Sequence, residues 1–189
     1  RRFAGGKKIF KLPGGEIYID ADMDIDADGS PRARAIDPCA GCGQPSTSLS
    51  YLGISGQARF VNAEEVPYIA LPGSNRHLRD RFYVQMGLQL GDIAAVINGD
   101  KIEFALFADV GPPDKIGEGS IFLSQSLGHD PFITRRNGTR IIGSSIDRDV
   151  IYIVFPHSKP SGLAPRNVVE TVRERGRELF ASIGGHAAP

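Results

Sequence analysis

Aspartates alternate with apolar residues along the segment from Tyr18 to Gly29. Every second position is acidic, at Asp20, Asp22, Asp24, Asp26 and Asp28, and the positions between them are Ile19, Ala21, Met23, Ile25 and Ala27. Side chains with a period of two share one side of an extended chain, whereas a helix would scatter them around its circumference. Because Asp is also a poor helix former, the pattern predicts a strand or extended ribbon, about 27 Å long, with one apolar and one acidic edge.

Apolar runs elsewhere predict further strands and one long helix. The strands are expected at Val66 to Leu71, Ile93 to Ile97, Ile102 to Ala108 and Val150 to Phe155. Asn98 and Gly99 join the second and third of these runs and predict a hairpin with a type I′ turn. An apolar stripe predicts a C-terminal amphipathic helix from Pro165 to Ile183, ended by Gly184. Strands separated by glycine and proline predict an α+β fold that is mainly β, with a barrel or sandwich core.

Length and composition favour one domain over residues 1–189, with loose ends at about 1–16 and 184–189. The chain has 189 residues, 41% of them hydrophobic, and 23 glycines, which is enough for a core with many turns. Lys and Arg number 22, as do Asp and Glu, and no basic run is present, so we expect no nucleic-acid partner. No segment has the length of a membrane span and no signal peptide is visible, so no membrane association is expected.

Asp109 and Glu118 are the candidate catalytic residues. Asp109 follows an apolar run and precedes Gly111, and Glu118 stands between two glycines, which would let backbone or a substrate come close. Two carboxylates are what acid/base cleavage of a glycosidic bond needs. In the alternative interpretation, Asp109 forms a turn and Glu118 is a first-turn acid of a short helix from Ser120 to Leu127.

The row of aspartates needs cations, because like charges repel. Asp24 to Gly29 match the start of an EF-hand loop, but the twelfth position is Ala35 where a bidentate Glu is required. Calcium in another geometry, a polyamine substrate, and a solvated acidic edge without any ligand stay open as interpretations. We assign no metal ligand and no cofactor.

Cys39 and Cys42 are separated by two residues in a loop rich in proline and glycine. The chain lacks the setting of a thioredoxin motif, and haem attachment would need a histidine where Gly43 stands. Zinc would need two more ligands nearby. A local disulfide or two free thiols is therefore expected.

Several segments together resemble the glycoside hydrolase family seventy-five chitosanases, the fungal-type endo-chitosanases. The resemblance runs from about Ile17 to Ser158 and rests on the segments at 20–30, 66–72, 91–96, 109–120 and 152–156. It implies a secreted enzyme that hydrolyses chitosan with inversion, with Asp109 and Glu118 as the catalytic pair. We assign Glu118 as the acid and Asp109 as the base, although the reverse assignment stays open. The substrate amines would then pair with Asp22, Asp24, Asp26 or Asp28.

A second, shorter resemblance concerns the fold. Asp109-Val-Gly followed by Lys115-Ile-Gly is similar to the acidic motif of the double-psi barrels of lytic transglycosylases, which implies a double-psi β-barrel core. Two alternative functions accompany the chitosanase hypothesis. One is an enzyme acting on another amino-sugar polymer such as peptidoglycan, and the other is a non-catalytic module that binds sugar or calcium through the aspartates. The oligomeric state is not predicted.

Overall fold

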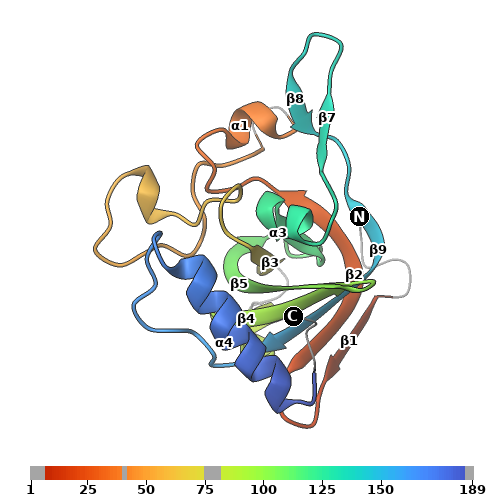
Figure 1. The fold of residues 1–189 in the computed structure, drawn as a ribbon, viewed down its shortest axis with the longest axis vertical. Helices are drawn as coiled ribbons and strands as arrows, with labels where there is room; N and C mark the ends of the chain where they lie inside the picture. Colours follow the sequence, from red (N-terminus) through yellow and green to blue (C-terminus); the bar gives the residue numbers. More distant parts are fainter. Residues whose placement is uncertain (1–6, 40–41, 75–81, 186–189) are drawn as a thin grey trace.

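Six strands close into a β-barrel in a computed structural model that describes residues 7–39, 42–74 and 82–185. Around the barrel the order is β2 (Ile17–Asp26), β6 (Glu118–Ser120), β3 (Tyr68–Pro72), β5 (Lys101–Gly111), β4 (Ile93–Asn98) and β9 (Ile146–Phe155), and β9 pairs again with β2 (Figure 1). The pairs β2–β6 and β3–β5 are parallel and the others are antiparallel. The predicted α+β fold with a barrel core is confirmed, and the double-psi topology stays a prediction.

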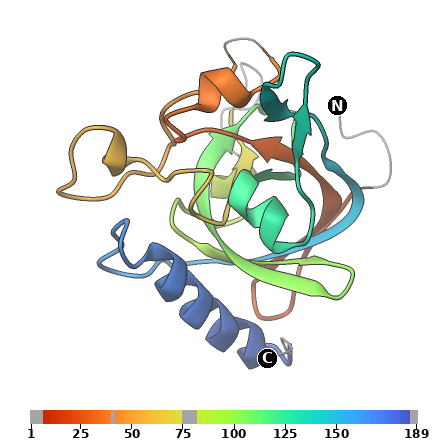
Figure 2. The same cartoon turned by 45° about the horizontal axis from the view of Figure 1, so that its top comes forward.

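Short elements surround this barrel. A separate hairpin is formed by β7 (Phe132–Thr134) and β8 (Arg140–Ile142), and the helical segments are α1 (Ala33–Ile36), the 3-10 helix at Gln57–Arg59, α2 (Phe82–Gln85), α3 (Ile121–Ser126) and α4 (Val168–Ser182). Figure 2 brings forward the end of the molecule where α1 and the β7–β8 hairpin stand together. None of the helices in the described residues is both long and apolar enough to cross a membrane.

The alternating segment forms β2, as its period predicts. Ile17, Ile19, Ala21 and Met23 belong to the core inside the barrel, together with Phe107 and Val154 from the facing strands. The strand ends at Asp26, so Asp28 lies in the turn that follows. A glycine at position 29 permits the positive φ of that turn and the close approach of the Val61 carbonyl.

The N-terminal segment corrects one expectation. Residues 1–16 were expected to be a loose end, but Lys8–Lys11 form strand β1, which pairs antiparallel with Ile17–Asp20 of β2. An edge strand of this kind hydrogen-bonds to an otherwise unpaired stretch of β2. Residues 1–6 and 186–189 lie outside the described part of the chain.

The predicted hairpin is confirmed as β4 and β5, but its turn lies one residue further on. Asn98 pairs with Lys101, which leaves Gly99 and Asp100 as the two loop residues. Of these two, Gly99 alone has a positive φ, 60°. That is the pattern of a type II′ turn, with glycine at the first central position, so the type I′ prediction was wrong.

Helix α4 covers the outer face of β4 and β5 (Figure 1). It begins at Val168, three residues after the expected start, and ends at Ser182 before Gly184, whose φ of 82° fits a C-terminal cap. A side chain at Gly176 would collide with the ring of Phe104, so glycine allows the helix to approach the sheet closely.

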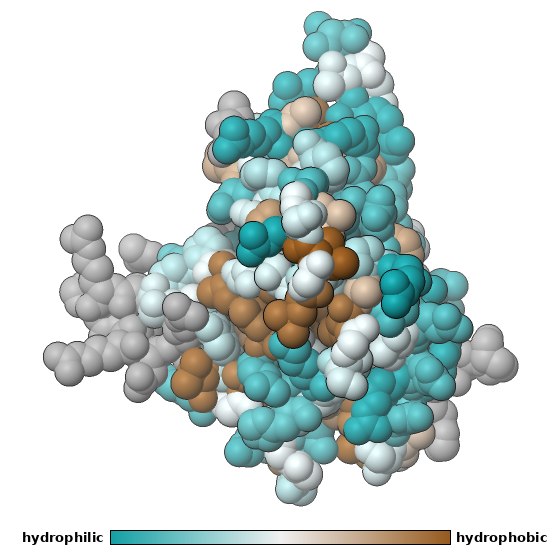
Figure 3. Space-filling model, turned by 90° about the vertical axis from the view of Figure 1, so that its left-hand side faces the viewer, coloured by the Kyte–Doolittle hydropathy of each residue, from teal (hydrophilic) through white to brown (hydrophobic). Residues whose placement is uncertain are grey.

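The surface on the left of Figure 1 is mostly hydrophilic around a central apolar area (Figure 3).

Candidate active site

Four residues lie in register across four neighbouring strands at one end of the barrel. Asp24 of β2 pairs with Glu118 of β6, Glu118 pairs with Ala70 of β3, and Ala70 pairs with Asp109 of β5. The structure therefore brings together the two predicted catalytic carboxylates and one aspartate of the acidic row. Two strand spacings of about 4.8 Å separate the backbones of Glu118 and Asp109, which gives roughly 10 Å.

A β-bulge turns Asp109 toward this row. Ile69 pairs with Phe107, whereas the next residue, Ala70, pairs with Asp109, so that Ala108 is passed over in the register. Strict alternation would have placed Asp109 on the side of Phe107, inside the barrel. The bulge therefore places a carboxylate beside Ala70 and Glu118, outside the barrel core.

Three residues of this row, Asp24, Glu118 and Asp109, line a cleft with a volume of about 880 Å³. The cleft is also lined by the loop that follows α1 and by the β7–β8 hairpin with the residues after it, through Ile133, Ile142 and Ser144. Among the described residues, six carboxylates and one ammonium group line the cleft: Asp24, Asp26, Asp28, Asp37, Asp109, Glu118 and Lys115. The excess of carboxyl groups over ammonium groups favours a cationic ligand.

Asp109 is held through one of its two carboxylate oxygens. Its Oδ1 accepts hydrogen bonds from the backbone N–H of Ser48 at 2.9 Å, from the Ser48 hydroxyl at 2.6 Å and from the backbone N–H of Val110 at 2.8 Å. Within the described part of the chain, no donor reaches Oδ2. Asp109 is only 7% exposed, so these contacts fix it in a largely buried position.

Glu118 is buried and paired with Lys115. The Lys115 ammonium donates to Glu118 Oε1 at 2.6 Å and lies 3.5 Å from Asp24 Oδ2, while Glu118 Oε2 is buried without a hydrogen-bond partner among the described residues. Burial raises the pKa of Glu118, Lys115 opposes this, and Asp24 and Asp109 add to the rise. Glu118 lies in β6, before the N-cap Ser120 of α3, so its interpretation as a first-turn helix acid was wrong.

Asp26, Asp28 and Asp109 form a compact group of carboxylates, with one oxygen from each lying within 4.8 Å of the others. Burial, followed by repulsion from Asp28 and Asp109, raises the pKa of Asp26 well above its usual value. Burial also raises the pKa of Asp28 to about 7, partly offset by a hydrogen bond from the Gln44 N–H. Among the described residues these three would be the ligands of a metal ion, and they suit an ammonium group equally well.

Asp22 is separated from the other aspartates of the row. It is buried, and its Oδ1 accepts a hydrogen bond at 2.6 Å from the ammonium of Lys7, which also donates to the Ile116 carbonyl. Asp22 is not among the residues that line the cleft. The structure therefore gives Asp22 an internal ion pair, whereas Asp24, Asp26 and Asp28 face the cleft.

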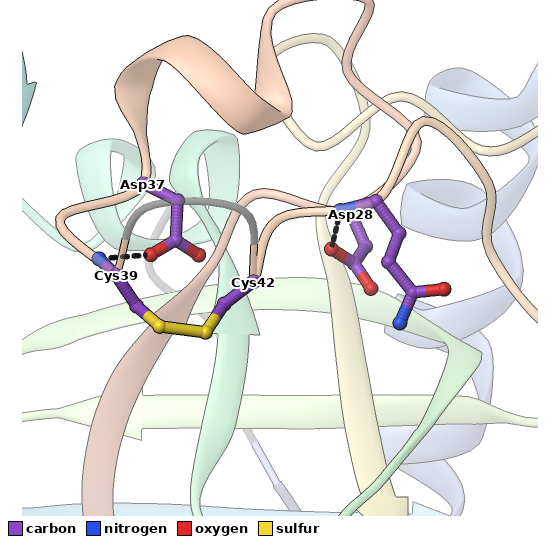
Figure 4. Close-up of a disulfide and its surroundings, with 5 residues drawn as sticks. Asp28, Asp37, Cys39 and Cys42 are labelled. Carbon is purple, nitrogen blue, oxygen red and sulfur yellow. Dashed lines mark hydrogen bonds between the residues drawn. A yellow bond between two sulfur atoms is a disulfide. The ribbon is translucent and has the colours of Figure 1, made fainter.

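Cys39 and Cys42 form a disulfide (Figure 4). This selects the disulfide from the two states expected for these cysteines. Both cysteines line the cleft. The loop is tied down on both sides, since Asp37 accepts from the Cys39 N–H and Asp28 accepts from the Gln44 N–H. The disulfide thus lies in a loop that positions Asp28 at the edge of the cleft.

Sequence reasoning missed three groups in or beside the cleft: Ser48, Lys115 and Asp37. Lys115 stands three residues before Glu118, a spacing that offered a local signal for the ion pair. Ser48 lies 61 residues before Asp109, and no local pattern connects them.

A cleft that presents a pair of carboxyl groups fits glycoside hydrolases, which cleave the glycosidic bond with two such groups. The model of a family described as fungal chitosanase of glycosyl hydrolase group 75 matches residues 23–182 of this chain. The chain belongs to this family, which confirms the resemblance noted in the sequence and makes the protein a chitosanase-type glycoside hydrolase with a polysaccharide substrate. Comparison with the curated proteins finds none that matches the chain.

Proposed function

We propose that this protein is an endo-acting chitosanase that hydrolyses β-1,4 linkages between glucosamine units with inversion. The observation that carries the proposal is that Glu118 and Asp109 pair with Ala70 from opposite sides and that both line an acidic cleft. Inverting enzymes hold their carboxyl groups about 6.5 to 9.5 Å apart so that a water molecule fits between base and sugar. Two backbones separated by one intervening strand suit that separation.

Glu118 acts as the general acid and Asp109 as the general base. An acid must be protonated before the reaction, and burial raises the pKa of Glu118 in that direction. A base must be charged, and Asp109 accepts three hydrogen bonds on Oδ1, which stabilise a negative charge. Its Oδ2 is the oxygen that takes a proton from water.

Asp24, Asp26 and Asp28 bind the amines of the polymer. Each lines the cleft, and charge pairs with more than one amine of the polymer would add to the binding. Asp22 is left out of this set because Lys7 already neutralises it. The excess of carboxylates favours a polyamine over peptidoglycan, whose peptide stems carry carboxylates of their own. We also propose that the enzyme is secreted, which the disulfide supports.

Release of reducing ends from soluble chitosan tests this function. The wild type should release them, and Glu118→Gln and Asp109→Asn should each lose about 10² to 10⁴ in rate. Glu65→Gln, at an exposed position outside the cleft, is the matched control and should keep full activity. Circular dichroism should show all four proteins folded.

The same assay separates the alternatives. A wild type that cleaves cell-wall glycan and not chitosan would overturn the substrate assignment and keep the hydrolase. A folded wild type that cleaves neither polymer yet binds chitosan would be a binding module, and Asp26→Asn should then weaken binding while Glu118→Gln should not abolish it.

A further inference from the structure

We propose that Ser48 is a positioning residue for the base Asp109, an inference that rests on the proposed function. Ser48 contacts Asp109 twice, through its backbone N–H and its hydroxyl, and both groups donate to the same oxygen, Oδ1. The Val110 N–H is a third donor to that oxygen and also lies 3.2 Å from the Ser48 hydroxyl. The three groups fix the orientation of the carboxylate by holding one oxygen and leaving the other free.

The segment that carries Ser48 is anchored on both sides of it. The Leu49 N–H donates to the carbonyl of Ala108, the residue passed over at the bulge, so Ser48 is held next to Asp109. On the other side, the Thr47 hydroxyl donates to the Leu49 carbonyl and accepts from the Val61 N–H. Ser48 itself is exposed, so its hydroxyl contributes little to core packing.

This arrangement gives the two oxygens of Asp109 different tasks. With Oδ1 occupied by donors, Oδ2 takes the proton from the attacking water while the water oxygen bonds to the anomeric carbon. The bond between that carbon and the glycosidic oxygen breaks, and the leaving oxygen takes the proton of Glu118. Loss of the Ser48 hydroxyl would let the carboxylate rotate and would weaken the stabilisation of its charge.

Kinetics of Ser48→Ala test the proposal. This substitution keeps the backbone N–H and removes the hydroxyl alone, so kcat on chitosan should fall about tenfold or more, with little change in KM. The acid limb of the pH profile should move to higher pH, because a charged base loses a donor. Ser48→Thr, which restores a hydroxyl, should recover most of the activity and the original profile.

Ser46→Ala is the matched control in the same segment, since the Ser46 hydroxyl is not a donor to Asp109 in the described structure. An active wild type in which Ser48→Ala matches Ser46→Ala in kcat and in pH profile would overturn this inference and leave the proposed function intact. Equal losses in Ser48→Ala and Ser48→Thr would also overturn it, because they would indicate a steric role. A wild type without activity on chitosan would overturn both proposals.

Discussion

Glu118 and Asp109 both pair with Ala70, from opposite sides, so that a single strand separates the two carboxylates. This relationship depends on the bulge at Ala108 and on the short parallel pairing of β6 with β2. The separation of the two carboxyl groups decides whether a glycosidase inverts or retains the anomeric configuration. The strand between Glu118 and Asp109 therefore favours inversion. A retaining enzyme needs its carboxyl groups about 5 to 5.5 Å apart, which a directly neighbouring pair of strands provides more readily.

We therefore predict that the first product released from the β-linked polymer carries the α configuration at its new reducing end. Proton NMR of the anomeric signals during the first minutes of digestion measures this before mutarotation mixes the anomers. An initial excess of the β anomer would contradict the assignment of Asp109 as a base that activates water. The Glu65→Gln protein should give the same anomer as the wild type.

Lys115 offers a way to tell the acid from the base. Its ammonium lowers the pKa of Glu118, against the effect of burial, so Lys115→Met should raise that pKa further. If Glu118 is the acid, it then stays protonated to higher pH and the alkaline limb of kcat/KM moves upward. Movement of the acid limb instead would mean that Glu118 is the base. Lys101→Met, at an exposed position on the β4–β5 hairpin, should leave both limbs in place.

Gly111 leaves space for the side chain of Glu118. A Cβ at this position would overlap Glu118 Oε2, which is the far end of a flexible side chain, and Gly111 does not have a positive φ that would strain alanine. Gly111→Ala should therefore displace the carboxylate, lower kcat on chitosan about tenfold to a hundredfold, and change the unfolding free energy by less than about 1 kcal/mol.

Gly14→Ala is the control for this prediction, because its added methyl would meet the carboxylate of Glu16 in the same way, outside the cleft. Activity measured beside thermal unfolding distinguishes the two effects. A Gly111→Ala protein with full activity would show that the position of Glu118 in the cleft is not critical.

Local patterns in the sequence predicted the elements and the two carboxylates. The period of two between Tyr18 and Gly29, the apolar run before Asp109 and the stripe of the C-terminal helix each depend on neighbouring residues, and each predicted element is present. The strand ends at Asp26, before the last aspartate of the pattern, and the helix begins three residues after its expected start. Gly117 lets backbone come close, as expected, since a side chain there would collide with the Asp22 carbonyl. A side chain at Gly119 would instead collide with the core side chains of Met23 and Leu123.

Such local patterns could not predict contacts between distant parts of the chain. Alternation predicted that Asp22 lies with the other aspartates, but Asp22 pairs with Lys7 of the N-terminal segment and does not line the cleft. Strict alternation would also have put Asp109 inside the barrel, and the bulge that prevents this is set by the pairing of β3 with β5. The hydrogen bond from Ser48 to Asp109 joins residues 61 positions apart, so it can be identified only in the folded structure.

Asp28 should reduce stability above neutral pH, and Asp28→Asn should restore it. Burial raises the pKa of Asp28 from 3.8 to about 7, so the folded protein binds the proton more tightly than the unfolded chain does. A carboxyl of this kind contributes stability at low pH that is lost as the pH rises from about 4 through about 7.

Asparagine still accepts the hydrogen bond of the Gln44 N–H without the charge. We therefore expect equal stability near pH 4 and a gain of about 1 to 2 kcal/mol at pH 8, after allowance for screening by solvent. Urea unfolding of wild type, Asp28→Asn and the exposed control Asp100→Asn across this range measures the gain, and parallel curves for wild type and Asp28→Asn would contradict it.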